Sequence, residues 1–81
     1  MSFMVYIKYD GEWDGHIATR NRSFSIDGTG DWYTTLYDVD RGSVIVSKLD
    51  DSDKRLTLKL YTDNKLIFEG STTAKFGVVT N

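Results

Sequence analysis

The sequence predicts a single all-β domain, an antiparallel β-sandwich of seven or eight short strands over residues 1–81. β-Branched and aromatic residues alternate with polar ones at a period of two, the pattern of half-buried strands. No window keeps the 3.6-residue apolar period over the ~10 residues that a helix needs. Turn-forming residues recur every ~8 to 12 residues, which is typical of a sandwich or, alternatively, of a small closed barrel.

The N-terminal half is predicted to hold four strands, at residues 3–10, 13–19, 23–26 and 32–37. Alternation groups apolar side chains on one face of each of the first three strands: Val5 with Ile7 and Tyr9, Trp13 with Ile17, and Phe24 with Ile26. Residues 27–31 are the strongest turn signal, because Gly28 and Gly30 can both adopt a positive φ at little cost. Residues 38–42 are predicted to be a loop.

The C-terminal half is predicted to add strands at residues 43–49, 55–62, 65–71 and 76–80. Leu56, Leu58 and Leu60 alternate with polar residues and are expected to face the core. Residues 50–53 are predicted to form a polar hairpin tip, and 63–64 a tight hairpin turn. The chain contains no proline, so charged residues are expected to protect the sheet edges: Lys8, Asp10, Lys48 and Lys59.

Composition excludes several classes of function. Ten basic and twelve acidic residues give a net charge of −2, the wrong sign for a domain that binds double-stranded nucleic acid or an anionic membrane through charge. Cysteine is absent, which excludes disulfides and thiolate-bound metals. The N-terminus lacks a basic region followed by an apolar stretch, and no segment approaches the ~20 apolar residues of a membrane span. We therefore expect a soluble, cytoplasmic protein.

The segment 55–80 resembles the end of the soluble domain of the MmpS-type transport accessory proteins. In that family, a strand, a short turn, an apolar-acidic strand, a Ser-Thr segment and an aromatic-x-Val-Val strand follow in this order. Residues 5–11, Val-Tyr-Ile-Lys-Tyr-Asp-Gly, also look like the first strand and turn of the family. The resemblance covers about half of the chain, which lacks the family's membrane anchor and has Asn64 in place of a turn glycine. The resemblance implies an immunoglobulin-like β-sandwich that acts through protein contacts and not by catalysis.

Aromatic residues supply the main candidate binding site. Trp13, Trp32, Tyr33 and Tyr37 could form a platform for a sugar ring or a peptide, although Trp32 could equally fill the core. Tyr33 and Tyr37 lie on the opposite strand face from Trp32, so both sets are buried only if the strand is covered on both sides. With Arg20 and Arg22, the same aromatic residues could alternatively stack single-stranded nucleic acid.

Catalytic and metal sites have weaker support. A Ser-His-Asp set of Ser23, His16 and Asp27 can be written down, but no nucleophile elbow accompanies it, and an exposed strand histidine is the simpler interpretation of His16. The acidic loop residues do not follow the spacing of a calcium loop, and Gly28-Thr29-Gly30 lacks the rest of a phosphate loop. We expect no catalytic residues, no metal and no cofactor.

The favoured hypothesis is therefore a non-enzymatic binding or protein-interaction module, whose partner is another protein or a second copy of the chain. A small-ligand or carbohydrate-binding domain that uses Trp13, Trp32 and Tyr33 is the alternative, and a hydrolase around His16 is a distant third. These hypotheses differ in what they require of the fold. An interaction module needs an exposed apolar patch, a ligand binder needs an aromatic-lined hollow, and a hydrolase needs His16 beside a nucleophile or carboxylate.

Overall fold

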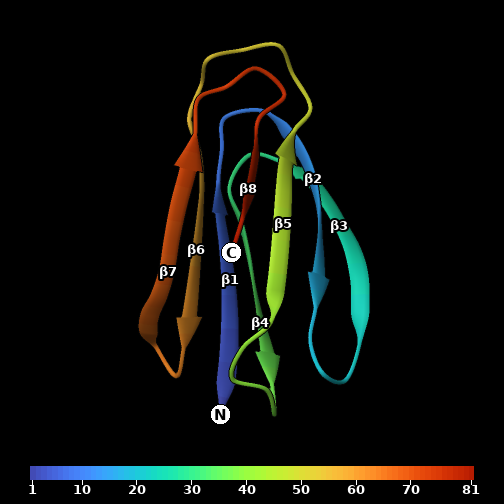
Figure 1. The fold of residues 1–81 in the computed structure, drawn as a ribbon, viewed down its shortest axis with the longest axis vertical. Helices are drawn as coiled ribbons and strands as arrows, with labels where there is room; N and C mark the ends of the chain where they lie inside the picture. Colours follow the sequence, from blue (N-terminus) through green and yellow to red (C-terminus); the bar gives the residue numbers. More distant parts are fainter.

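The computed structural model describes residues 1–81 and consists of eight strands and no helix. The strands stand along the long axis of the molecule and form two layers (Figure 1). Their bounds are β1 Ser2–Lys8, β2 Glu12–Ala18, β3 Ser23–Thr29, β4 Trp32–Tyr37, β5 Ser43–Lys48, β6 Leu56–Thr62, β7 Lys65–Thr72 and β8 Val78–Thr80. The predicted all-β fold and the number of strands are confirmed.

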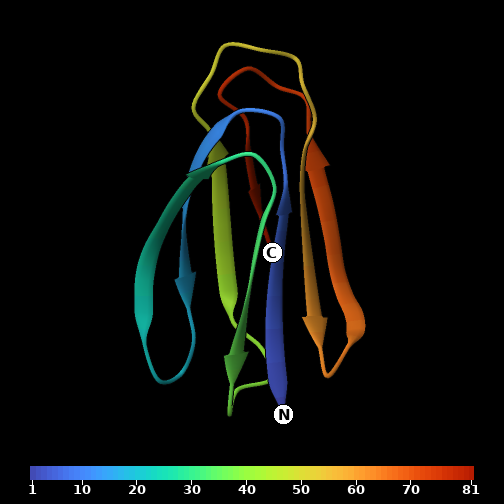
Figure 2. The same cartoon turned by 180° about the vertical axis from the view of Figure 1, so that it is seen from behind.

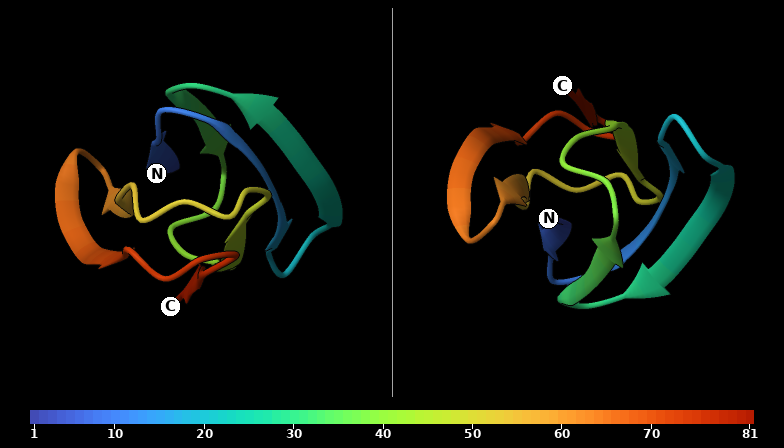
Figure 3. Two further views of the ribbon diagram at one scale, coloured as in Figure 1. Left: turned by 90° about the horizontal axis from the view of Figure 1, so that it is seen from above. Right: turned by 90° about the horizontal axis from the view of Figure 1, so that it is seen from below.

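Two antiparallel sheets of four strands pack as a sandwich, in the orders β4-β1-β6-β7 and β3-β2-β5-β8. Figure 3, which looks along the strands from either end, shows the two layers facing each other. The predicted sandwich is confirmed, and the chain does not form the closed barrel that was the alternative. The two-layer antiparallel sandwich is shared with immunoglobulin domains, but the strands divide four and four, and β1 pairs with β4 and β6 and not, as in the ABED sheet of an immunoglobulin constant domain, with the next strand along the chain.

Alternating side chains from both sheets form one core between the layers. It contains 14 buried hydrophobic residues, and Leu56, Leu58 and Leu60 are fully enclosed, as predicted. Phe24, Ile26, Trp32 and Phe68 pack against this core from its margins and are partly buried. The core therefore follows the period-two pattern of the sequence almost residue by residue.

The predicted turn at residues 27–31 is wrong in extent, because β3 continues to Thr29 and only Gly30 and Asp31 connect it to β4. Gly30 has the positive φ, 84°, that the turn requires. Gly28 instead lies within β3, opposite Trp13. A Cβ atom there would lie 2.9 Å from Cζ2 of Trp13, so this glycine makes room for the indole ring.

Of the two predicted C-terminal turns, one is confirmed and the other is wrong. Asp63 and Asn64 both have positive φ, 48° and 68°, and form the tight β6–β7 hairpin as predicted. Residues 50–53 are not a hairpin tip, because β5 and β6 belong to different sheets and the loop crosses between them. The strand predicted at residues 76–80 starts too early, because β8 begins at Val78 and Phe76, with a positive φ of 51°, lies in the turn before it.

The prediction that Lys8, Lys48 and Lys59 protect sheet edges is wrong. These residues lie on β1, β5 and β6, each of which has a neighbour on both sides, and Asp10 follows β1 in a turn. The edge strands are β3, β4, β7 and β8. Strand order depends on contacts between distant segments, which local alternation does not encode.

Candidate binding surface

Four tyrosines and a methionine gather on the outer face of the β4-β1-β6-β7 sheet, and we call this group the tyrosine face: Met4, Tyr6, Tyr33, Tyr37 and Tyr61. Tyr6 on β1 lies directly opposite Tyr33 on β4. Met4 is paired with Tyr61 on β6, and Tyr37 lies at the end of β4. Directly opposed residues of antiparallel strands share a face at ~5 Å, so these side chains form one continuous surface.

The face is open to solvent along its β4 side. Tyr33 and Tyr37 are 69% and 73% exposed, whereas Met4, Tyr6 and Tyr61 are half-buried by their neighbours. The inward residues of β4 alternate with them, and Leu36 is buried in the core. The prediction that Tyr33 and Tyr37 oppose the face of Trp32 is therefore confirmed.

The charges on the two outer faces of the sandwich have opposite signs. Lys8 and Lys59 flank the tyrosines, and Nζ of Lys59 lies 4.0 Å from Oε2 of Glu69. The outer face of the β3-β2-β5-β8 sheet instead carries the carboxylates of Glu12, Asp14 and Asp27, and all three are exposed. The tyrosine face is therefore the less acidic of the two.

The two tryptophans of the predicted platform lie on the inner side of the sheets. Trp13 is fully buried, and its Nε1 donates a hydrogen bond of 2.9 Å to the carbonyl of Gly30. Trp32 is half-buried and packs on Trp13, with 5.5 Å between the ring centroids. Trp13 therefore offers no ring face to a ligand, and the platform that would combine it with Tyr33 is not assembled, because the two side chains lie on opposite sides of a sheet.

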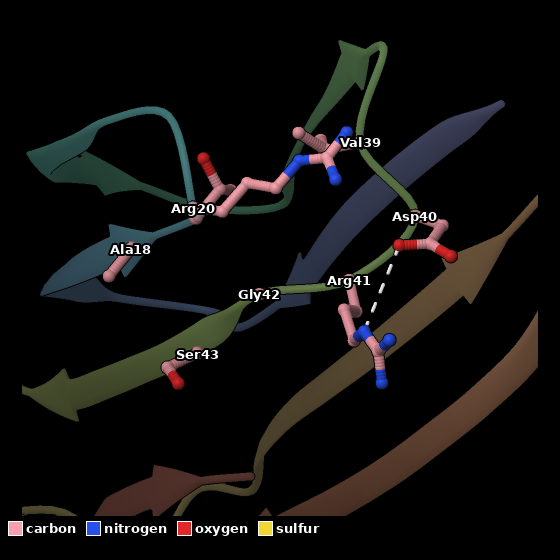
Figure 4. Close-up of a pocket in the computed structure, with 8 residues that line it drawn as sticks. Ala18, Arg20, Val39, Asp40, Arg41, Gly42 and Ser43 are labelled. Atoms are coloured by element: carbon pink, nitrogen blue, oxygen red, sulfur yellow. Dashed lines mark ion pairs between the residues drawn. The ribbon is translucent and has the colours of Figure 1, made fainter.

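Arg20 and Arg22 both lie in the connection between β2 and β3, two strands of the other sheet. The guanidinium carbon of Arg22 lies 5.4 Å from the ring centroid of Phe24. Arg20 lines a pocket of about 500 Å³ between this connection and the β4–β5 loop, where Nε of Arg41 lies 3.8 Å from Asp40 (Figure 4). The arginines predicted to act with the tyrosines thus connect strands of the β3-β2-β5-β8 sheet, whereas Tyr33 and Tyr37 belong to the β4-β1-β6-β7 sheet.

His16 lies on the outer face of β2, where its register partner is Ser25 and not Ser23. Nδ1 of His16 is 3.4 Å from Oγ of Ser25. Asp27 is opposite Asp14, and Ser23 is opposite Ala18, so the Ser23-His16-Asp27 set is spread along the ladder. The acidic loops likewise bring no three His, Asp or Glu side chains close enough together to hold a metal ion.

A second cluster, which sequence reasoning missed, closes one end of the sandwich. Lys48 is 1% exposed, and its Nζ donates to the carbonyl oxygens of Ser52 at 2.6 Å and Lys54 at 2.8 Å, with Thr73 at 3.5 Å. The Tyr9 hydroxyl donates to Oδ1 of Asp50 at 2.5 Å. Alternation was the available signal, because Lys48 is in phase with the buried Val44 and Val46.

These contacts shift two ionisation equilibria. Burial raises the pKa of Tyr9 above its ordinary value of 10.0, and its hydrogen bond to the Asp50 carboxylate adds to the rise. The hydroxyl groups of Tyr9 and Ser52, in that order, hold the pKa of Asp50 below its ordinary value of 3.8. The cluster consists of one buried ammonium, one hydrogen-bonded carboxylate and two hydroxyls, and it ties the β5–β6 loop to β1.

Sequence reasoning also missed Tyr6, Tyr61 and Met4 as members of the candidate surface. Each occupies an outward phase of its strand, so alternation alone could have marked it as exposed. Their grouping with Tyr33 and Tyr37 requires the order β4-β1-β6, which joins segments far apart in the chain. Two cavities, of about 500 and about 560 Å³, have no member of the tyrosine face in their lining.

Comparisons of the chain with known protein families, with curated proteins and with solved structures found no match. The resemblance to MmpS-type proteins therefore stays a prediction. The structure forms no helix long and apolar enough to cross a membrane.

Proposed function

We propose that this chain is a non-enzymatic protein-interaction module that binds its partner through the tyrosine face. The observation that supports this proposal is the register of Tyr6 with Tyr33 and of Met4 with Tyr61 on one sheet face. Tyrosine and methionine are enriched in protein interfaces, and tyrosine gives a large contact area at a low cost in conformational entropy.

The shape of the surface favours a protein partner over a small ligand. Small ligands are usually enclosed in concave sites, whereas protein partners dock on broad and nearly flat ones. The tyrosine face spans the three strands β4, β1 and β6, and it lies outside both of the larger cavities. Tyr33 and Tyr37, the most exposed tyrosines, are accessible along the β4 side.

Site-specific photo-crosslinking tests this proposal. A benzophenone amino acid is placed at Tyr33 and, as the matched control, at Ser25, an exposed position on an edge strand of the other sheet. We expect the variant at position 33 to crosslink one defined protein in extracts of the source organism. The partner, once purified, should bind the Tyr6→Ala/Tyr33→Ala double variant at least ~10-fold more weakly, the loss expected for two central aromatic contacts.

Equal crosslinking from positions 33 and 25 would contradict the proposal, since it would indicate random encounter. Unchanged affinity of the double variant for the purified partner would also contradict it. The fold of each variant is checked by its thermal unfolding. The midpoint should be nearly unchanged for the change at Tyr33, which is 69% exposed, whereas loss of the half-buried Tyr6 side chain should lower the midpoint but preserve cooperative unfolding.

The carbohydrate-binding alternative has one observation in its favour. Tyr33 and Tyr37 are exposed on the same face of β4, four residues apart, which at ~3.3 Å per residue corresponds to about 13 Å along the strand. Two rings at that spacing could stack on separate units of an extended oligosaccharide. Titration of the ¹⁵N-labelled chain with such oligosaccharides should then shift the amides of β4, and unshifted amides would exclude this alternative.

A further inference from the structure

The backbone of β4 has an unpaired side that faces away from its own sheet. β4 is the last strand of the order β4-β1-β6-β7, so β1 is its only hydrogen-bonded neighbour. Figure 2 shows β3 and β4 diverging from their short connection, so the neighbouring sheet does not cover this side along the length of β4. The strand therefore ends its sheet with a free row of main-chain groups.

The register identifies which groups are free. The N–H of Asp38 donates to the carbonyl of Met1 at 3.1 Å, and residues 32–37 continue the same antiparallel register with β1. In such a ladder, alternate residues direct both N–H and C=O toward the partner strand. Leu36 and Thr34 thus face β1 like Asp38, whereas the backbones of Tyr33, Thr35 and Tyr37 point away from it.

β4 also lacks the features that protect the other three edges. β8 has only three residues, and β7 contains a register shift together with the charged residues Lys65 and Glu69. β3 carries Asp27 and Gly28. The sequence of β4, Trp-Tyr-Thr-Thr-Leu-Tyr, has no charge, glycine, proline or irregularity in its register with β1, and a regular edge of this kind is a template for pairing with another strand.

We propose that β4 pairs antiparallel with β4 of a second copy of this chain, joining the two four-stranded sheets into one sheet of eight strands. The strand fits itself, because a two-fold axis at Thr35 places Thr35 opposite its own copy and Tyr33 opposite Tyr37 of the other chain. This register is an isologous contact that closes at two copies. Each of its three residue pairs exchanges two N–H···O=C bonds and uses the free backbone groups of both strands.

The same register keeps the two faces of the sheet consistent. Directly opposed residues of antiparallel strands project to one side, so outward tyrosines meet outward tyrosines and Leu36 meets Thr34 on the inner side. The tyrosine faces of the two copies then become one continuous surface. The pairing uses main-chain groups, and it stands independently of whether the tyrosine face binds another protein.

The carboxylates at the ends of β4 predict a salt dependence. Asp31 and Asp38 precede and follow the strand, and both are exposed. In the antiparallel pair, Asp38 of one copy comes next to Asp31 of the other, and like charges at such positions repel. Salt screens exposed charges, so we expect the dimer to strengthen as ionic strength increases.

A charge swap at position 35 tests the pairing and its register together. Sedimentation equilibrium of the wild-type chain should give twice the mass of 9.2 kDa as concentration rises into the millimolar range. Thr35→Lys and Thr35→Glu each place like charges opposite one another and should weaken association at least ~10-fold. An equimolar mixture of the two variants should recover the affinity of the wild type.

Control variants separate loss of pairing from loss of fold. Thr35→Pro removes an N–H that points away from β1, so it should abolish the dimer and preserve the cooperative unfolding of the monomer. Ser25→Lys, the same change of charge on the β3 edge, should leave the dimer intact. A wild-type chain that stays monomeric throughout would overturn the proposal.

Two further outcomes would also overturn it. If the dimer survives Thr35→Pro, it uses another surface. If the mixture of the Thr35→Lys and Thr35→Glu variants stays monomeric, position 35 does not lie opposite its own copy, and the proposed register is wrong. A benzophenone at position 33 lies at the β4–β4 contact, so it would also crosslink two copies of the chain into a product of twice 9.2 kDa. A crosslink to a different protein has another mass, so failure of one proposal is recognisable without failure of the other.

Discussion

The ammonium of Lys48 lies over the ring of Tyr9, with Nζ 5.6 Å from the ring centroid. Lys54 approaches the same ring, with its Nζ at 5.4 Å. Two ammonium groups therefore lie near the ring of Tyr9, while its hydroxyl donates to Asp50. The electron-rich face of an aromatic ring attracts cations, so this arrangement offsets part of the cost of burying the Lys48 charge.

Lys48→Met is expected to lower the free energy of unfolding by about 3 kcal/mol, because it leaves carbonyl oxygens of Ser52 and Lys54 without their buried donor. Chemical denaturation measures the loss. Lys59→Met is the matched control, since Lys59 is partly exposed and makes one ion pair at 4.0 Å, worth less than about 1 kcal/mol. Equal losses in the two variants would show that the Lys48 contacts contribute nothing specific.

Tyr9→Phe is expected to destabilise the chain at neutral pH by about 1 to 3 kcal/mol, because the hydroxyl is a donor to the Asp50 carboxylate. It should also flatten the dependence of stability on pH. The pKa of Asp50 is lowered by folding, so its contribution is complete above 3.8 and is lost as pH falls through the lower folded value.

The dependence of stability on pH in the alkaline range follows from the raised pKa of Tyr9. Its contribution is complete below pH 10.0 and is lost as pH rises through the raised pKa of the folded state. The difference in stability between wild type and Tyr9→Phe should therefore be largest between these limits and smaller beyond each. Denaturation at a series of pH values measures it, and a difference independent of pH would contradict the assigned contacts.

Trp13→Phe is expected to cost about 3 kcal/mol, since it leaves a cavity in the core and removes the hydrogen bond to the Gly30 carbonyl. In this variant Trp32 is the remaining tryptophan, and in a Trp32→Phe variant Trp13 is. Acrylamide should quench the fluorescence of the half-buried Trp32 more readily than that of the buried Trp13. Equal quenching of the two residues would contradict the burial of Trp13.

Gly15→Ala is expected to destabilise the sandwich by about 2 kcal/mol, because its Cβ would lie 2.4 Å from the carbonyl oxygen of Ile45 on the adjacent strand. The three nearest atoms all belong to the backbone of β5, which leaves little room for relief. Gly30→Ala is an informative comparison, since open space surrounds that position and only its φ of 84° opposes the substitution. Unfolding midpoints of the two variants separate a steric clash from conformational strain.

Local alternation was sufficient to predict the inner and outer sides of the strands, as Leu56 and Leu58 on β6 and Tyr33 on β4 show. It was insufficient wherever distant segments meet. Tyr6 and Tyr61 join the candidate surface only because β1 and β6 are neighbours. Gly28, predicted to be a turn residue, lies within β3, where the absence of a side chain leaves room for the ring of Trp13.

Lys48 shows a different limit of the sequence. Its phase matched that of the core, but its charge indicated an exposed position. A lysine can extend its aliphatic stem across a core and reach backbone carbonyls at the far side. The loops that supply those carbonyls come close to Lys48 only in the folded chain, so the sequence does not indicate them.

The path of the chain between the layers has a consequence for how the molecule assembles. Only the β2–β3 and β6–β7 connections stay within one sheet, and the other five cross to the opposite layer. Every continuous piece of polypeptide that contains all four strands of one layer also contains three strands of the other, so neither layer can be cut out as a fragment of its own. Folding therefore requires many distant pairings to form together, and a single proteolytic cut that releases β1 should cause both layers to unravel in one step.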